Sequence, residues 1–105
     1  MLVNMKDILV KAREGHYGVI APTIRSADEI KHAIEAAEHK NSPVILNFNI
    51  TYDFVAEDAD LELVMLVARE RAMRSSVPVA LNVDHGKDFA TCMRGIHYGF
   101  GSVMI

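Results

Sequence analysis

The chain has few of the features that would place it in a specialised class of protein. Its single cysteine, Cys92, cannot form an internal disulfide, which fits a reducing cytoplasmic compartment. No apolar run approaches the roughly 20 residues that a membrane-spanning helix needs, and the N-terminus lacks the basic start and apolar core of a signal peptide. No Lys or Arg cluster offers a surface for nucleic acid or anionic lipid. We therefore expect a cytoplasmic protein with neither a membrane nor a nucleic-acid partner.

Linkers and low-complexity segments are also missing. No stretch rich in Pro, Gly or Ser divides the 105 residues, and this length fits one small domain with its own core. The formal net charge is −3 and 50% of the residues are hydrophobic, a balance found in ordinary globular proteins. The sequence therefore predicts a single domain over residues 1–105.

Apolar segments with the composition of strands alternate with segments of helical periodicity. The expected strands are residues 17–21, 43–50, 77–83 and 102–105. A further helix is expected before them, starting at Asn4 and ending near Gly15. Strands that alternate with helices predict a parallel sheet whose strands are joined by right-handed crossovers.

The expected helices carry end signals and apolar faces. Ser26 and Glu29 form a capping box at the start of the first crossover helix. Gly99 is expected to stop the last one. The apolar face predicted for the second crossover helix consists of Leu61, Val64, Met65, Ala68 and Ala72. The face predicted for the last helix consists of Phe89, Cys92, Met93 and Ile96.

Two of the expected strands have one apolar face and a second face that becomes polar towards the end of the strand. The polar face carries Asn47 and Asn49 in the first of them, and Asn82 and Asp84 in the next. A parallel strand covered by helices on both sides should be apolar on both faces. Barrel strands instead turn one face inwards, where it lines a polar pocket at the carboxyl end. The pattern favours a barrel, and a doubly wound sheet is the alternative.

An acid and an imidazole lie side by side where residues 77–83 end. Asp84 continues the inward phase of Asn82, so its carboxylate is expected to face the pocket and to transfer protons. His85 follows at the exit of the strand, where its imidazole could bind a metal ion. Gly86 is expected to let the backbone turn sharply beside it. Asp84 could instead cap the following helix, but Asp88 is better placed for that position.

Together with Val77-Pro78-Val79-Ala80 before it and Gly99-Phe100-Gly101-Ser102-Val103-Met104-Ile105 after it, Asp84-His85-Gly86 carries a family resemblance. The chain resembles class II (zinc-dependent) fructose-bisphosphate aldolases and the related tagatose-bisphosphate aldolases over nearly its whole length. The resemblance implies the N-terminal part, about half, of a (β/α)8 TIM barrel with a leading helix. Such barrels usually need about 250 residues, so we expect either an N-terminal fragment or a truncated product.

The resemblance also implies an activity. Family members reversibly cleave fructose- or tagatose-1,6-bisphosphate into dihydroxyacetone phosphate and glyceraldehyde 3-phosphate. Asp84 would be the acid/base at the C4 hydroxyl of this phosphorylated ketose, and His85 would bind Zn²⁺, the expected cofactor. The remaining zinc ligands and the phosphate site are expected beyond Ile105, because one imidazole does not make a catalytic zinc site. The other histidines are expected to be solvated or to serve in packing: His16, His32, His39 and His97. The resemblance further implies a homo-oligomer.

The sequence departs from the family pattern at three candidate substrate-binding positions. Thr23 stands where an Asn is typical, Asn49 lies in a stretch that usually contains a Ser, and Asn82 replaces a frequent His. These changes leave the preferred sugar open, and Asn49 and Asn82 could instead form hydrogen bonds inside the barrel without touching substrate.

Two other functions remain alternatives. One is a truncated, catalytically inactive half barrel that self-associates to cover its open edges. The other is a nucleotide- or phosphate-binding α/β domain, although the glycine-rich strand-to-helix loop of such domains is missing.

Overall fold

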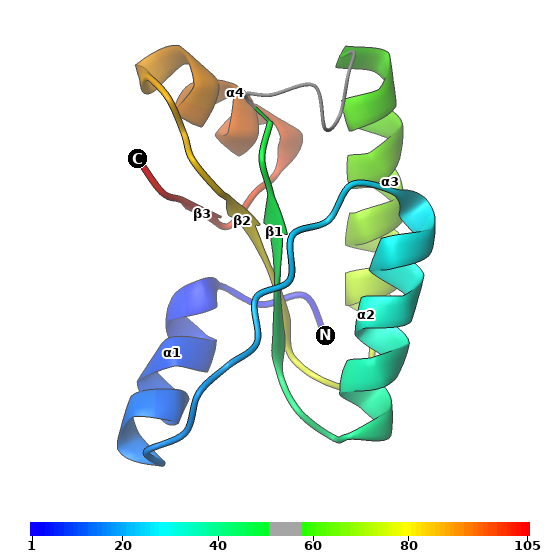
Figure 1. The fold of residues 1–105 in the computed structure, drawn as a ribbon, viewed down its shortest axis with the longest axis vertical. Coiled ribbons are helices and arrows are strands. Elements are labelled where there is room, and N and C mark those ends of the chain that lie inside the picture. The colour runs from blue at the N-terminus through cyan, green and yellow to red at the C-terminus, as the bar shows by residue number, and fades with distance from the viewer. Residues whose placement is uncertain (51–57) are drawn as a thin grey trace.

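The computed structural model describes residues 1–50 and 58–105. Its elements in chain order are α1 (Met5–Glu14), α2 (Ala27–His39), β1 (Val44–Phe48), α3 (Asp58–Arg74), β2 (Val79–Val83), α4 (Phe89–Tyr98) and β3 (Ser102–Val103). Within the described residues the strands form one parallel sheet in the order β1-β2-β3 (Figure 1). The predicted alternation of strands and helices, the parallel sheet and the leading helix are thereby confirmed.

The first expected strand, residues 17–21, is not a regular strand. Isolated bridges pair Ile20 with Val44 and Thr23 with Asn47. The backbone N–H groups of β1 donate to the carbonyls of Ile20 and Pro22, at 3.1 and 3.0 Å. In this parallel arrangement residue 22 should donate the next bond to β1, but Pro22 has no N–H. An extended segment therefore lies beside β1 without a continuous ladder.

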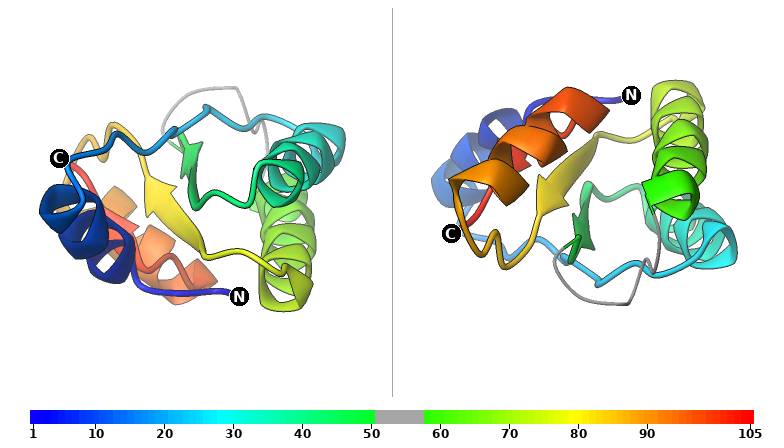
Figure 2. Two further views of the ribbon diagram at one scale, coloured as in Figure 1. Left: turned by 90° about the horizontal axis from the view of Figure 1, so that it is seen from below. Right: turned by 90° about the horizontal axis from the view of Figure 1, so that it is seen from above.

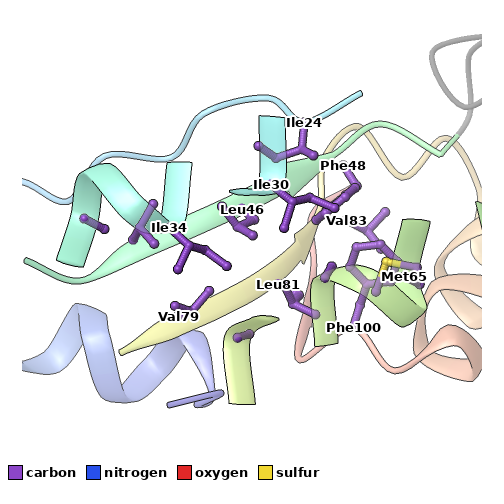
Figure 3. Packing of buried hydrophobic residues seen from close by; sticks show 14 of the residues in the cluster. Ile24, Ile30, Ile34, Leu46, Phe48, Met65, Val79, Leu81, Val83 and Phe100 are labelled. Carbon is purple, nitrogen blue, oxygen red and sulfur yellow. The ribbon is translucent and has the colours of Figure 1, made fainter. Parts of the chain in front are cut away.

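The two faces of the sheet have different neighbours, as the alternation predicted. On one face, strand residues such as Leu46, Phe48 and Leu81 pack with Ile30 of α2 and Met65 of α3 (Figure 3). We call this the helix-facing core. On the other face, Ile45 and Ala80 pack with Ile8 of α1, and these three form the inner cluster. Figure 2 shows α2 and α3 together on one side of the sheet and α1 on the other.

The apolar face predicted for α4 is confirmed at Cys92 and wrong at its three other residues. Cys92 and Gly95 are the buried residues of this helix, whereas its larger apolar side chains are exposed: Phe89, Met93 and Ile96. A Cβ atom at Gly95 would lie 2.4 Å from Cγ2 of Val83. The helix therefore approaches the sheet through its small residues. The prediction, which used apolar periodicity alone, places the larger apolar side chains against the sheet. In α3 the prediction holds, since Leu61, Met65, Ala68 and Ala72 are all buried.

The helix ends follow their sequence signals. Asn4 caps α1 by accepting from the backbone N–H of Lys6 at 2.9 Å, and Ser26 caps α2 by accepting from that of Glu29 at 3.3 Å. Gly99 closes α4 with a φ of 90°, a left-handed conformation that suits glycine. None of the helices in the described ranges has both the length and the hydropathy that crossing a bilayer requires.

Candidate functional site

The candidate site lies at the carboxyl end of β2. The backbone N–H of Asp84 donates to the carbonyl of Phe48 at 2.9 Å, which joins the ends of β1 and β2. The side chain of Asp84 is 17% exposed and that of His85 is 68% exposed. His85 Nε2 lies 3.9 Å from Asp84 Oδ2, which is longer than a hydrogen bond. A shielded carboxylate and an accessible imidazole therefore stand next to each other at the end of one strand.

The turn after Asp84 is made by His85, and the expectation for Gly86 is wrong. His85 has a φ of 54°, in the left-handed region, whereas Gly86 does not have a positive φ. Non-glycine residues in this region are uncommon, although His is enriched among them. Glycine is needed at position 86 for space, because a Cβ atom there would lie 2.7 Å from both Cys92 Sγ and the carbonyl oxygen of Met104. The backbone N–H of Gly86 donates to that oxygen at 2.6 Å.

Asp88, and not Asp84, caps α4, as predicted. Its carboxylate accepts from the backbone N–H of Thr91 at 2.8 Å. This hydrogen bond lowers the pKa of Asp88, because it stabilises the charged form. The carboxylate of Asp84 is therefore not engaged in capping the helix.

The three candidate substrate-binding residues lie in different environments. Thr23 is exposed beside the end of β1. Asn49 is 7% exposed, just after β1. Asn82 is 5% exposed inside β2, one inward-facing position before Asp84. Thr23 lies beside β1, the strand whose last residue, Phe48, accepts the hydrogen bond from Asp84. Asn82 lies within β2, two residues before Asp84.

Hydrogen bonds between side chains cross the inward face of the sheet at the level of Asn82. Asn82 Nδ2 donates to Asn47 Oδ1 at 2.9 Å, and Ser102 Oγ donates to Asn82 Oδ1 at 2.7 Å. We call Asn47, Asn82 and Ser102 the polar row. Their backbones are aligned in the register of the sheet, Asn47 opposite Asn82 and Asn82 opposite Ser102.

Sequence reasoning missed Ser102. The residue is the first of a short strand, and nothing in its neighbours along the chain marks it as a partner of Asn82. The register between β2 and β3 would have been needed to find it, and hydrophobic periodicity does not reveal the register of a two-residue strand.

The residues present fit part of a zinc site. Within the described residues, no three His, Cys, Asp or Glu side chains come together as a group that could hold a metal ion. A catalytic zinc takes about three protein ligands, and the end of β2 offers one of them, the accessible imidazole of His85. The other histidines are all exposed, as expected for solvated side chains: His16, His32, His39 and His97.

A hollow of about 630 Å³ lies elsewhere, between residues 17–22 and the end of α2. Apolar atoms dominate its lining, which includes Tyr17, Ile20 and Ala33. Neither Asp84 nor His85 contributes to it. The chemistry-bearing side chains therefore lie at the strand ends, away from this hollow.

The comparison with known proteins gives a family match and close structural similarity. A family model described as "Fructose-bisphosphate aldolase class-II" matches residues 3–105. A 6-phospho-5-dehydro-2-deoxy-D-gluconate aldolase of Bacillus licheniformis is 37% identical over 103 residues, which is 98% of this chain and 35% of that protein. A fructose-bisphosphate aldolase of Cupriavidus necator is 36% identical over 104 residues, 99% of this chain and 30% of that protein. The chain thus spans 30% to 35% of the length of these curated relatives.

A solved structure has the same arrangement of elements. The crystal structure of the YdjI aldolase from Escherichia coli K12 superposes with a TM-score of 0.90 at 25% identity. The match covers 100% of this chain and 40% of that one. It confirms the predicted fold, the N-terminal part of a (β/α)8 barrel with a leading helix.

Proposed function

The chain belongs to the class-II fructose-bisphosphate aldolase family, and we propose that it supplies the acid/base Asp84 and the metal ligand His85 of a zinc-dependent ketose-bisphosphate aldolase. The reaction would be the reversible cleavage of fructose- or tagatose-1,6-bisphosphate into dihydroxyacetone phosphate and glyceraldehyde 3-phosphate. The observation that carries the proposal is the pairing of a shielded carboxylate with an accessible imidazole at the carboxyl end of β2. Barrel enzymes of this class keep their chemistry at that end of the strands.

Asp84 would carry the proton. Its carboxylate is 17% exposed, so a substrate hydroxyl could reach it while bulk water is largely kept away. It would accept the proton of the C4 hydroxyl as the bond between C3 and C4 breaks, and return that proton in the reverse direction. The hydrogen bond from its own N–H to Phe48 holds the backbone of this residue against β1.

His85 would hold the metal together with ligands from outside the described residues. Its imidazole is 68% exposed and extends from a left-handed turn. When bound, zinc supplies Lewis-acid polarisation of the substrate ketone. Thr23 and Asn49 remain predicted substrate contacts, whereas the side chain of Asn82 is hydrogen-bonded to Asn47 and Ser102, which favours the alternative of hydrogen bonds inside the barrel.

The two curated relatives described above have different substrates in their names, and both names indicate aldolases. We therefore propose a phosphorylated ketose as the substrate class and leave the sugar open between fructose, tagatose and another ketose. The cytoplasmic location and the homo-oligomer stay predictions.

The role of Asp84 is tested with a matched pair of aspartates. In the protein that carries these residues, at its native length, Asp84→Asn should lower kcat for cleavage of fructose- or tagatose-1,6-bisphosphate by about 10²- to 10⁴-fold, the usual contribution of a general acid/base. Asp88→Asn is the control, because Asn also caps helices and Asp88 lies outside the site. Unchanged cleavage by Asp84→Asn would refute the assignment.

The role of His85 is tested by metal content. His85→Ala should lower the zinc bound per chain and abolish cleavage, whereas the exposed His97→Ala on α4 should do neither. If the unaltered protein neither binds zinc nor cleaves either sugar, and self-associates, the inactive half barrel replaces the aldolase as the better description.

A further inference from the structure

We propose that the polar row positions Asp84, so that Asn47, Asn82 and Ser102 support the turnover of the reaction without touching the substrate. This inference rests on the proposed function, because it assigns the row to the proton transfer at Asp84. It concerns residues one layer beneath the site, on the same inward face.

The hydrogen bonds of the row have one direction. Asn47 Nδ2 donates to the backbone carbonyl of Ala21 at 3.3 Å, and a carbonyl can only accept. The Oδ1 atom of Asn47 must then face Asn82, which donates to it through Nδ2. The remaining Oδ1 of Asn82 needs a donor, and the hydroxyl of Ser102 supplies it at 2.7 Å. One acceptor at the end of the row thus sets the orientation of every side chain in it.

The row joins segments that the backbone ladder holds weakly. Residue 21 belongs to the irregular segment beside β1, where Pro22 interrupts the ladder. At the other end, β3 is two residues long. Asn82 is 5% exposed, and a hydrogen bond in a buried place is costly to leave unmade. The side chains of the row therefore connect four extended segments, which are the segment beside β1 and the strands β1, β2 and β3. They do so where the backbone hydrogen bonds are fewest.

This register decides where Asp84 stands. Its N–H is bonded to Phe48 on one side, and the loop after it is bonded to Met104 on the other through the N–H of Gly86. The residue after β3 returns to β2, since the N–H of Met104 donates to the carbonyl of Val83 at 2.9 Å. A shift of β3 would move Met104, which is hydrogen-bonded to both Val83 and Gly86 on either side of Asp84. Small displacements of a reacting group are known to cost large factors in rate.

Asn82 itself is poorly placed to bind substrate. Its Nδ2 and Oδ1 atoms are both engaged within the row, and the side chain is nearly buried. Loss of the row is therefore expected to change kcat and to leave KM nearly unchanged, the signature of an interaction that acts through Asp84.

The test removes one hydroxyl from the row and one from a matched position. In the protein at its native length, Ser102→Ala should lower kcat for ketose-bisphosphate cleavage about tenfold, the size expected for one lost hydrogen bond, with KM within about twofold. Ser102→Thr keeps the hydroxyl and should restore kcat. Ser75→Ala is the control, because Ser75 also has a hydrogen-bonded hydroxyl but lies ahead of β2, at the opposite end from Asp84.

Hydrogen exchange provides a readout that does not need activity. Ser102→Ala should speed exchange of the Asp84 amide proton by about tenfold, while the Val79 amide at the start of β2 keeps its rate. Unchanged exchange at Asp84 would overturn the positioning role, as would a rise in KM at constant kcat, which would make the row a substrate contact. If the unaltered protein cleaves no ketose bisphosphate, the proposed function fails, and the exchange rates alone decide whether the row positions Asp84.

Discussion

The helix-facing side and the inward side of the sheet are built from alternate residues of the same strands. The buried residues of the first side are apolar, whereas the second side also buries polar side chains. On β2, Leu81 and Val83 point to α2 and α3 and belong to the helix-facing core. Ala80 and Asn82 point the other way, and the alternation predicts that Asp84 continues that face beyond the strand. Because successive side chains of a strand point to opposite faces, each residue that faces the helices is followed by one that faces inwards. The same short segment therefore serves stability on one face and chemistry on the other.

The inward face also changes along its length, and the helix-facing core does not. At the amino end it is apolar, where Ile8 of α1 covers Ile45 and Ala80. The polar row follows in the middle, and Asp84 stands at the carboxyl end. The inward face is therefore apolar at the amino end of the strands, which α1 covers, and becomes polar towards their carboxyl end.

The largest effect on stability is expected on the helix-facing core. The ring of Phe48 is fully buried and packs edge to face with Phe100, with centroids 5.4 Å apart. Phe48→Ala should lower the free energy of unfolding by about 3–5 kcal/mol, measured by urea denaturation. Phe89→Ala is the matched control, because the Phe89 side chain is 79% exposed and should change it by less than about 0.5 kcal/mol. Equal losses in the two variants would contradict the burial of Phe48 in the helix-facing core.

A smaller effect is expected at the loop above the inward face. Gly86→Ala would place a Cβ atom against Cys92 Sγ and the carbonyl oxygen of Met104, so the free energy of unfolding should fall by about 1–3 kcal/mol. Gly18→Ala is the control, since no atom lies within 4 Å of the Cβ position there. If Gly86→Ala proves as harmless as Gly18→Ala in thermal denaturation, the close approach of Met104 to the loop is wrong.

The smallest effect concerns Asp88, a carboxylate that lies on neither face. The Thr91 N–H lowers the pKa of Asp88 in the folded protein relative to the unfolded chain. Its contribution to stability is therefore present above the unfolded pKa of about 3.9 and is lost as the pH falls through the lower folded pKa. Asp88→Asn keeps a capping side chain but cannot titrate in this way.

The unaltered protein should therefore have the higher Tm near neutral pH, and the difference should vanish in acid. Thermal melts followed by circular dichroism over a pH series measure this. A difference in Tm that stays constant down to strongly acidic pH would show that the charge of Asp88 is not its cause.

Most of the fold followed from local patterns in the sequence. The ends of α1, the left-handed stop at Gly99 and the cap at Asp88 depend on residues within one helical turn, and all were predicted. The errors came from contacts between segments. Gly95 allows α4 to lie against Val83, and Phe89 therefore points outwards. Pro22 interrupts the hydrogen-bond ladder beside β1, although the residues before it have the composition of a strand.

The candidate site divides in the same way. The alternation of residues within β2 and its end at Val83 predict that Asp84 continues the inward face, and His85 follows it along the chain. The need for glycine at position 86 comes from the approach of Cys92 and Met104, and neither it nor the left-handed turn at His85 is contained in the local pattern.

The amino-acid sequence by itself determined where β1 and β2 lie, which face of the sheet their side chains take and where the carboxylate and imidazole stand along the chain. These properties depend on periodicity and on capping, which act over a few residues. Only the tertiary structure decided that Asn47, Asn82 and Ser102 meet in one row beneath Asp84. The register between strands is set by hydrogen bonds and packing between segments far apart in the chain, so no local pattern contains it.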